Sequence, residues 1–382
     1  MTRSMCTDTA TTIREVDAVV LRTGIDPPWK TAAVTMTEMF VTAVRIRLAD
    51  GSEGWGECCV RAAPSATKAI VDELLGPQIL GCDAYEVEGL WNRMFEGQRS
   101  RGHTRGFLME AISGVDIALW DALGRSLGQP IHRLLHGVGR QTLDCYASCI
   151  FLGDPDLMIA EASRLVSAGY RAIKLKVGRD MHDDVRVIRG MRATLGDSVE
   201  IMADANGGFH AHDALALLDS VADCRLTFLE EPVPVDDLAG YRRLAAAGRV
   251  TPIAAGEAEG APAAFAPYIA DRLIDIVQPD VGRTGGITAS RKVANLAEAF
   301  HVQWAPHTGA SSGICIAASL QLAAAIPNLR IWEDMYTKQP LQELFSEPLP
   351  RQDGGRVNVP QGPGLGLTVD SDKISFFALT PL

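Results

Sequence analysis

Two lysines lie one residue apart in the segment RAIKLKVGRD. Ile173, Leu175 and Val177 are typical of one face of a buried strand, and because side chains alternate along a strand, Lys174 and Lys176 share the other face. An ammonium group that is flanked by another, and partly desolvated, loses its proton more easily. This spacing therefore favours a lysine base, and Lys176, nearer the strand end, is the candidate. The alternative is that both side chains snorkel outward at the rim of the fold.

Ionisable residues also follow the next apolar runs of the chain. One such residue alone is usually a helix N-cap or a solvated loop residue. When successive runs all end this way, one shared site explains the pattern better than independent caps. The residues are Lys174 and Lys176, then Asp204, Glu230, Glu257, Asp280, His307 and Glu333.

The runs themselves predict the fold that would bring these residues together. From Leu143 onward, short apolar runs alternate with amphipathic helical stretches, which is typical of parallel βα units. The runs are LDCYASC, RAIKLKV, VEIMADA, RLTFLEE, TPIAAGE, LIDIVQPD, HVQWAPH and LRIWED. Eight such units close a TIM-type barrel, in which chemistry takes place at the carboxyl ends of the strands.

The rest of the chain predicts an attached module. REVDAVVLRT and FVTAVRIRLADGSEGWGE are a strand-like pair, and GFLMEAISGVDIALWDALGRSLG is an amphipathic helix. We therefore expect an α+β capping domain at residues 1–142 and a catalytic α/β barrel at 143–338. The Pro- and Gly-rich segment 339–382 is expected to pack back on the cap.

Composition restricts the class of partner. The formal charge of -11 argues against a nucleic-acid partner. The sequence shows no signal-peptide pattern and no apolar run long enough to span a membrane, so we expect a soluble, cytoplasmic protein. The eight cysteines lack metal-site spacing and are expected to be reduced.

Three carboxylates from adjacent predicted strands, Asp204, Glu230 and Glu257, would project toward one point. An oxygen-only ligand set suits Mg²⁺, which keeps open positions for water and substrate. We therefore predict a magnesium site. If these residues did not share a site, Asp204 would be read as a helix cap, and Glu230 with Glu231 as a surface acidic pair. Glu231 is expected to point the other way and to form a structural ion pair.

Asp280 and His307 end neighbouring predicted strands. A carboxylate that accepts the proton of one imidazole nitrogen raises the basicity of the other, which makes His307 a candidate base or acid. Lys174 would hold a substrate carboxylate. Glu333 would either donate a proton to a developing enolate oxygen or cap a helix.

The order KxK, DAN, EEP, GE, QPD, PH and WE resembles the mandelate racemase subgroup of the enolase superfamily, over nearly the whole chain. The resemblance implies a modified (β/α)₇β barrel with an enolase-type cap. It also implies Mg²⁺ on the three carboxylates, a Lys176 base, an Asp280 and His307 dyad, and Glu333 beside the substrate carboxylate, with Asn206 of the DAN motif at the substrate. Some relatives of this kind carry a second lysine after the sixth strand. The segment IVQPDVGRTGG has no lysine, so the resemblance favours the relatives that use a histidine as their second acid or base. Such proteins are usually homo-oligomers.

The resemblance implies a first step shared by enolase-type sites, in which a base removes the proton α to a carboxylate and forms an enediolate. Loss of a β-hydroxyl then gives dehydration, whereas return of a proton gives racemisation or epimerisation. The cap segments carrying Trp29, Arg101 and His103 are polar, although these side chains could equally anchor the cap or face solvent. We therefore predict an acid-sugar dehydratase, with racemase, epimerase or lactone cycloisomerase as alternatives.

Two other interpretations remain at this stage. The barrel could bind metal and ligand without turnover. The pair Gly285 and Gly286 could seat a phosphate at a helix N-terminus, although a tight strand-to-helix turn explains it as well.

Overall fold

The computed structural model describes residues 9–380, and in this part of the chain eight parallel strands form a barrel sheet in the order β10-β9-β8-β7-β6-β5-β4-β11. The sheet closes where Trp304 N donates to Asn328 O (3.0 Å) and Arg330 N donates to Trp304 O (2.8 Å). The strands are β4 (Thr142–Ile150), β5 (Ala172–Lys176), β6 (Glu200–Asp204), β7 (Phe228–Glu230), β8 (Ile253–Ala255), β9 (Ile276–Val277), β10 (Gln303–Trp304) and β11 (Trp332–Met335).

A helix follows each strand except the last, as a (β/α)₇β barrel requires. Several helices begin where the sequence supplies a capping side chain: Asp154, Asp180 and Ser312 accept hydrogen bonds from backbone N–H groups in the first turns of α6, α7 and α12. The helices are α6 (Pro155–Ser167), α7 (Met181–Leu195), α8 (Ala211–Ser220), α9 (Leu238–Ala246), α10 (Pro262–Ala270), α11 (Gly286–Ala299) and α12 (Gly313–Ala325), with a short 3₁₀ turn η3 (Ala222–Cys224).

The inside of the barrel is filled below the predicted site. One buried apolar cluster gathers a side chain from each strand or its immediate end, and it includes Ala172 of β5. Because side chains alternate along β5, Lys174 and Lys176 point into the barrel above Ala172 rather than outward at the rim. The cluster consists of Tyr146, Ala172, Met202, Phe228, Ala254, Ile276, Ala305 and Ile331.

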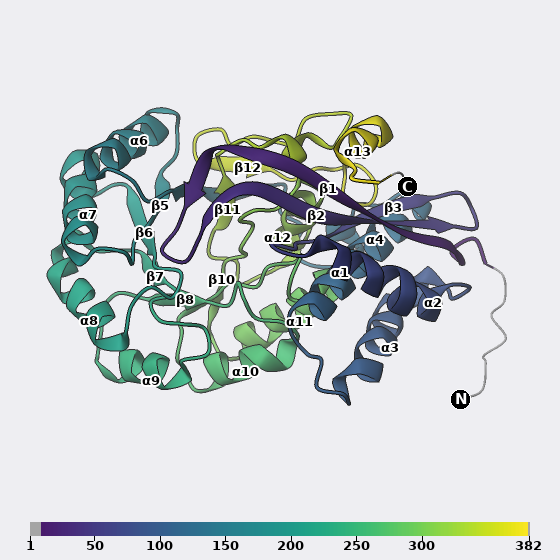
Figure 1. Cartoon of the computed structure of the whole chain (residues 1–382), viewed down its shortest axis with the longest axis horizontal. Coiled ribbons are helices and arrows are strands. Elements are labelled where there is room, and N and C mark those ends of the chain that lie inside the picture. Colours follow the sequence, from purple (N-terminus) through teal and green to yellow (C-terminus); the bar gives the residue numbers. More distant parts are fainter. Residues whose placement is uncertain (1–8, 381–382) are drawn as a thin grey trace.

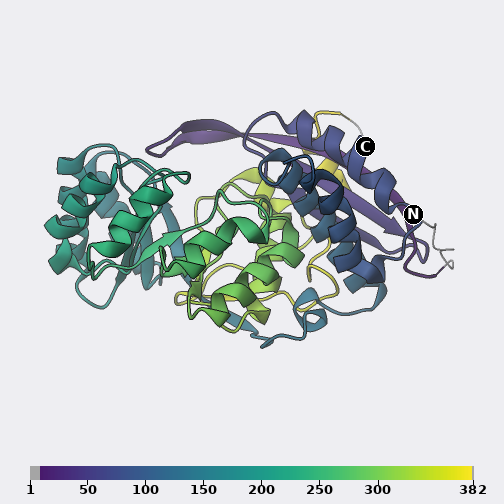
Figure 2. The same ribbon diagram turned by 90° about the horizontal axis from the view of Figure 1, so that it is seen from below.

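The segment before the barrel forms an antiparallel sheet, β1 (Ile13–Lys30), β2 (Thr35–Leu48) and β3 (Glu53–Cys58), with helices packed on it. The long β1–β2 hairpin extends from this sheet over the barrel (Figures 1 and 2). At its tip, Leu152 N of the loop after β4 donates to Lys30 O (3.0 Å). The helices are α1 (Pro64–Ala69), the π-helical η1 (Ile70–Leu75), α2 (Gly76–Ile79), the 3₁₀ turn η2 (Ala84–Glu86), α3 (Val87–Arg99), α4 (Phe107–Ser126) and α5 (Ile131–Leu134).

The C-terminal segment touches both parts. Its strand β12 (Arg356–Asn358) pairs antiparallel with β4, while α13 (Ser371–Phe377) contacts β1 and Leu379 N donates to Val20 O (2.9 Å). A 3₁₀ turn, η4 (Pro340–Glu343), precedes them. No helix among the described residues is both long and apolar enough to cross a membrane. The described cysteines are buried and free.

Buried polar groups of the cap hold the starts of two barrel helices. Glu57 at the end of β3 accepts hydrogen bonds from Ser312 N (3.0 Å), Ser312 Oγ and Cys315 N (3.0 Å) of α12. Ser113 Oγ of α4 accepts from Gly285 N (2.9 Å) and Gly286 N (3.0 Å) at the start of α11. These glycine N–H groups are therefore already bonded to the cap, which supports the tight-turn interpretation over a phosphate seat.

Helix α4 lies so close to β3 that only glycine fits at the contact. A Cβ on Gly56 would overlap the carbonyl oxygen of Gly114, which is backbone and cannot rotate away. We expect Gly56→Ala to lower the free energy of unfolding by about 1–3 kcal/mol, the usual range for overpacking. Urea denaturation followed by circular dichroism measures the change.

Gly97 provides the matched control. It lies within α3, and a Cβ there would meet nothing within 4 Å. Gly97→Ala should raise stability by about 0.5–1 kcal/mol, because alanine is the better helix former. Equal stability changes in the two variants would show that the approach of α4 to β3 does not depend on the glycine.

Candidate active site

A cavity of about 480 Å³ lies between the β1–β2 hairpin and the carboxyl ends of the barrel strands. This is the edge at which a parallel barrel collects its functional residues. The cap contributes Trp29, Met36, Glu38 and Arg61 to the lining, and the barrel contributes Lys176, Asn206, Glu231, Glu257, His307 and Glu333, among others.

Sheet register aligns the first charged groups of this site. Lys176 on β5 lies beside Asp204 on β6, and Asp204 lies beside Glu230 on β7. Glu257 follows β8, the next strand of the sheet. One carboxylate oxygen each from Asp204, Glu230 and Glu257 can be chosen so that all lie within 4.8 Å of one another, and all three residues are buried.

These three carboxylates fit a divalent cation. Glu230 Oε1 is buried without a hydrogen-bond partner. Burial and the neighbouring Asp204 raise the pKa of Glu230 to about 7, so the carboxylates are crowded enough to disfavour full ionisation. An oxygen-only donor set of this kind suits Mg²⁺.

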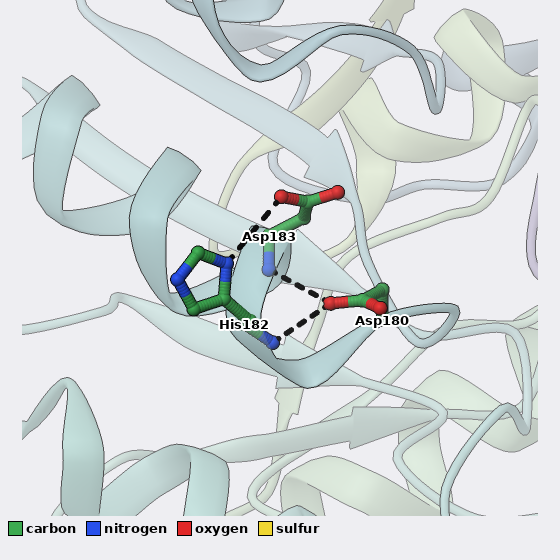
Figure 3. A group of neighbouring side chains, drawn as sticks. All are labelled: Asp180, His182 and Asp183. Atoms are coloured by element: carbon green, nitrogen blue, oxygen red, sulfur yellow. Dashed lines mark hydrogen bonds and ion pairs between the residues drawn. The ribbon is translucent and has the colours of Figure 1, made fainter.

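A second group, formed by Asp180, His182 and Asp183, is exposed (Figure 3). Asp180 Oδ1 accepts hydrogen bonds from His182 N (3.0 Å) and Asp183 N (3.1 Å), so it caps α7. Figure 3 shows the Asp180 carboxylate turned toward those backbone nitrogens. Helix capping accounts for this group without a metal.

The two lysines have different surroundings. Lys174 is 1% exposed and is not part of the cavity lining; its Nζ contacts Glu230 Oε2 (2.6 Å), Glu333 Oε1 (2.8 Å) and Tyr146 Oη (3.2 Å). Lys176 lines the cavity, and its Nζ pairs with Asp204 Oδ2. The structure therefore brings Lys176, and not Lys174, to the space where a substrate would lie.

Acidic partners outweigh the repulsion between the two lysines. Burial opposes the positive charge of Lys176, but Asp204 raises its pKa above the ordinary value, and the lowering effect of Lys174 is smaller. Burial likewise opposes charge on Lys174, whose pKa Glu230 and Glu333 raise. These contacts therefore oppose the expectation that a flanking ammonium makes each lysine lose its proton more easily, because each ammonium has a carboxylate in contact.

Asp280 and His307 form the expected pair. Their side chains meet through Asp280 Oδ2 and His307 Nδ1 (2.7 Å), and Gly282 N holds the other oxygen of Asp280 (2.7 Å). His307 Nε2 lies 2.9 Å from Glu257 Oε2. Burial disfavours charge on His307, but Glu257, Glu333 and Asp280 outweigh it and raise the pKa of the imidazole to about 10.

Glu333 is an acceptor in this structure. Ser148 Oγ (2.6 Å) and Thr308 N (2.6 Å) donate to its two oxygens, and Lys174 pairs with it. Burial opposes ionisation, but the charges of Lys174 and His307 and the hydrogen bonds from Lys174 and Ser148 lower the pKa of Glu333 to about 2. This ionised carboxylate is neither the protonated donor nor the helix cap considered from the sequence. The third expectation, that Glu333 lies beside the substrate carboxylate, stays a prediction, and Glu333 does line the cavity.

The cap residues expected at the substrate do not all reach the cavity. Trp29 lines it and stacks on Phe151, with ring centroids 5.2 Å apart. Arg101 and His103 are exposed and are not part of the lining, because the cap covers the barrel with its β1–β2 hairpin and not with the segment after α3. Asn206 does line the cavity, and its buried Oδ1 has no hydrogen-bond partner.

Sequence reasoning missed three charged residues of the lining, Glu38 of the hairpin, Glu231 and Arg61. Glu231 faces the cavity, contrary to the expectation that it forms a structural ion pair on the opposite face. Strand β7 ends at Glu230 and Glu231 has a φ of 38°, so strand alternation no longer sets its direction. Arg61 was not considered, because it follows β3 in the cap and no local pattern ties it to the barrel.

Comparison with known proteins agrees with this architecture. Residues 157–373 match the family model described as Enolase C-terminal domain-like, and residues 13–136 match the mandelate racemase / muconate lactonizing enzyme N-terminal domain. The chain is 33% identical over 380 residues to the D-galactarolactone cycloisomerase of Agrobacterium fabrum, covering 96% of this chain and 99% of that protein. It is 32% identical over 336 residues to the arabinonate dehydratase of Saccharolobus solfataricus, covering 87% and 88%.

A solved structure shares the whole fold. The crystal structure of a racemase from Streptomyces coelicolor A3(2) with bound magnesium has a TM-score of 0.88 and 30% sequence identity, over 96% of this chain and all (100%) of that one. Sequence, family models and structure therefore agree, and they confirm the resemblance and the barrel-and-cap fold expected from the motifs. The chain is an enzyme of the enolase superfamily and belongs to its mandelate racemase and muconate lactonizing enzyme family.

Proposed function

We propose that this enzyme removes the proton α to the carboxylate of a sugar acid, an aldonate or aldarate, and dehydrates it through an enediolate to a 2-keto-3-deoxy acid, with Mg²⁺ as cofactor. The observation that carries the proposal is the placement of Lys176 and the Asp280 and His307 pair on one cavity beside three crowded carboxylates. The cytoplasmic location and the homo-oligomeric state stay predictions from the sequence.

Asp204, Glu230 and Glu257 would hold the Mg²⁺. When bound, the ion supplies Lewis-acid stabilisation for the negative charge that develops on the substrate carboxylate as the α-proton leaves. Lys174 acts behind these ligands as a positioning residue, because it ties Glu230 to Glu333. Asn206 Oδ1, which has no partner, is free to accept a hydrogen bond from a substrate hydroxyl.

Lys176 is the base in this proposal. Its ammonium group pairs with Asp204 Oδ2, and this pairing favours the charged form. Lys176 can therefore lose its proton only when another cation, such as Mg²⁺, offsets the charge of Asp204. The neutral amine then takes the α-proton, and the electron pair of the broken C–H bond enters the enediolate.

His307 is the acid. The negative charges of Asp280 and Glu333 favour the protonated imidazole, and Asp280 fixes the orientation of its ring. Transfer of that proton to the β-hydroxyl lets water leave as the enediolate collapses to an enol, which tautomerises to the 2-keto product. Each proton in the step thus has a donor and an acceptor.

Cycloisomerisation is the second candidate, and the A. fabrum cycloisomerase, 33% identical to this chain, is the observation that favours it. The same first step would apply to a lactone, with the ring carboxylate as leaving group. Racemisation or epimerisation would instead return a proton to the α-carbon. A screen of sugar acids and their lactones with Mg²⁺ separates these outcomes. Dehydration gives a 2-keto product that reacts with semicarbazide from the open-chain acid, cycloisomerisation gives such a product from the lactone alone, and racemisation or epimerisation gives none.

The metal site can be tested with Glu230→Gln. The amide keeps the shape of the side chain but removes one ligand charge, and Lys174 stays paired with Glu333, so the variant should fold. We expect Mg²⁺ affinity to fall by at least about 10- to 100-fold, the effect known for residues that merely support metal ligands. Calorimetric titration of Mg²⁺ into protein that has been freed of metal with a chelator measures the affinity.

The control is Asp180→Asn, which alters the exposed group of Figure 3 but keeps a good helix cap. Its Mg²⁺ affinity should equal that of the wild type. If Glu230→Gln kept the wild-type Mg²⁺ affinity, or if Asp180→Asn lost it, the assignment of Mg²⁺ to Asp204, Glu230 and Glu257 would be wrong.

The base and the acid can be separated by solvent deuterium. Lys176→Ala and His307→Asn should each lower turnover by about 10²- to 10⁴-fold, the range for a positioned acid or base. In D₂O, His307→Asn should still exchange the α-proton of the substrate, because Lys176 is intact, whereas Lys176→Ala should not. Proton NMR of the recovered acid measures the exchange.

His301→Asn is the matched control, since His301 is exposed and asparagine tolerates its positive φ of 57°. It should behave as wild type in both measurements. Near-normal turnover in Lys176→Ala, or exchange retained there and lost in His307→Asn, would contradict the assigned roles.

A further inference from the structure

Arg61 is a cation that the cap places in the active-site cavity. It lies just after β3, and its side chain is 34% exposed. Its Nη2 donates to Gly309 O (3.3 Å), in the loop after His307, and its Nη1 lies 3.7 Å from Glu257 Oε1, beyond hydrogen-bond reach. A guanidinium has five N–H donors in a planar fork, so most of them are free to meet a ligand.

The other cations of the described lining are already engaged. Lys176 pairs with Asp204, and His307 lies against Asp280 and Glu257. Glu38, the acidic residue that the hairpin contributes, pairs with Arg22. Arg61 is thus the cation of this lining that makes no hydrogen bond to a carboxylate of the protein.

The ligand that matches such a group is a second carboxylate. Arg binds carboxylates through two parallel hydrogen bonds, and these charge-assisted bonds are stronger than bonds to a neutral hydroxyl. Without Arg61, the glutamates that line the cavity, Glu231, Glu257 and Glu333, would repel a second negative charge. A cavity of about 480 Å³ is large enough for a six-carbon diacid.

We propose that Arg61 binds the distal carboxylate of the substrate and so selects dicarboxylic sugar acids, or their lactones, over monocarboxylic ones. This inference rests on the proposed function and narrows its substrate class. The carboxylate beside the reacting carbon would lie at the Lys176 end of the cavity and the distal one at the cap side, next to Arg61 and the loop of Gly309.

The test compares acids that share stereochemistry from C2 to C5 and differ only at C6, namely galactarate with galactonate and glucarate with gluconate. Wild-type protein with Mg²⁺ should show a higher kcat/KM for the diacid of at least one pair. Arg61→Gln should lower kcat/KM for that diacid by about 10- to 100-fold more than for the monoacid, the value of charge-assisted hydrogen bonds. Arg61→Lys should recover part of the preference, because it keeps the charge but loses the fork.

The Mg²⁺ concentration for half-maximal activity is measured in each variant, with Arg133→Gln, an exposed residue of α5, as the control. A wild-type preference for the monoacids overturns the proposal. So does an equal loss on both acids in Arg61→Gln. A raised Mg²⁺ requirement in that variant would show that Arg61 only supports Glu257. If wild-type protein exchanges the α-proton of no acid or lactone in the wider screen described above, the proposed function itself fails.

Discussion

Electrostatic repulsion among buried carboxylates is the constraint on which the rest of the site depends. Asp204, Glu230, Glu257 and Glu333 are all buried at the mouth of the barrel, where each would destabilise the others if left alone. Lys174, Lys176 and His307 lie between them and offset the charge. The two lysines side by side on β5 are therefore the cationic part of a buried charge network, and the repulsion between them is the smaller effect.

The fold fixes this network through sheet register. Lys176, Asp204 and Glu230 form one row across β5, β6 and β7, because the three strands are parallel and in register. The apolar cluster inside the barrel fills the space below the row and prevents the lysines from retreating into the core. The β1–β2 hairpin covers the row from above, and Glu57 ties the cap to α12, the helix that follows the His307 loop.

The sequence predicts the barrel and the strand-end residues well, because both depend on local patterns. Apolar runs separated by helices define the strands, and the carboxyl ends of parallel strands meet at one edge. Contacts across the chain are harder to predict. Nothing near Lys174 shows that Glu230 and Glu333 enclose it, and nothing near Arg101 or His103 shows that the hairpin, and not their own segment, covers the cavity. Glu231 was assigned to the wrong face because alternation was extended past the end of β7.

The central claim is that this site breaks the bond between the α-carbon and its hydrogen. The most direct measurement uses wild-type protein, Mg²⁺ and a sugar acid labelled with deuterium at C2, with the label followed by NMR and mass spectrometry. The account predicts that the deuterium passes to solvent and that its substitution slows turnover. Turnover that leaves the deuterium on C2 of the product would contradict it.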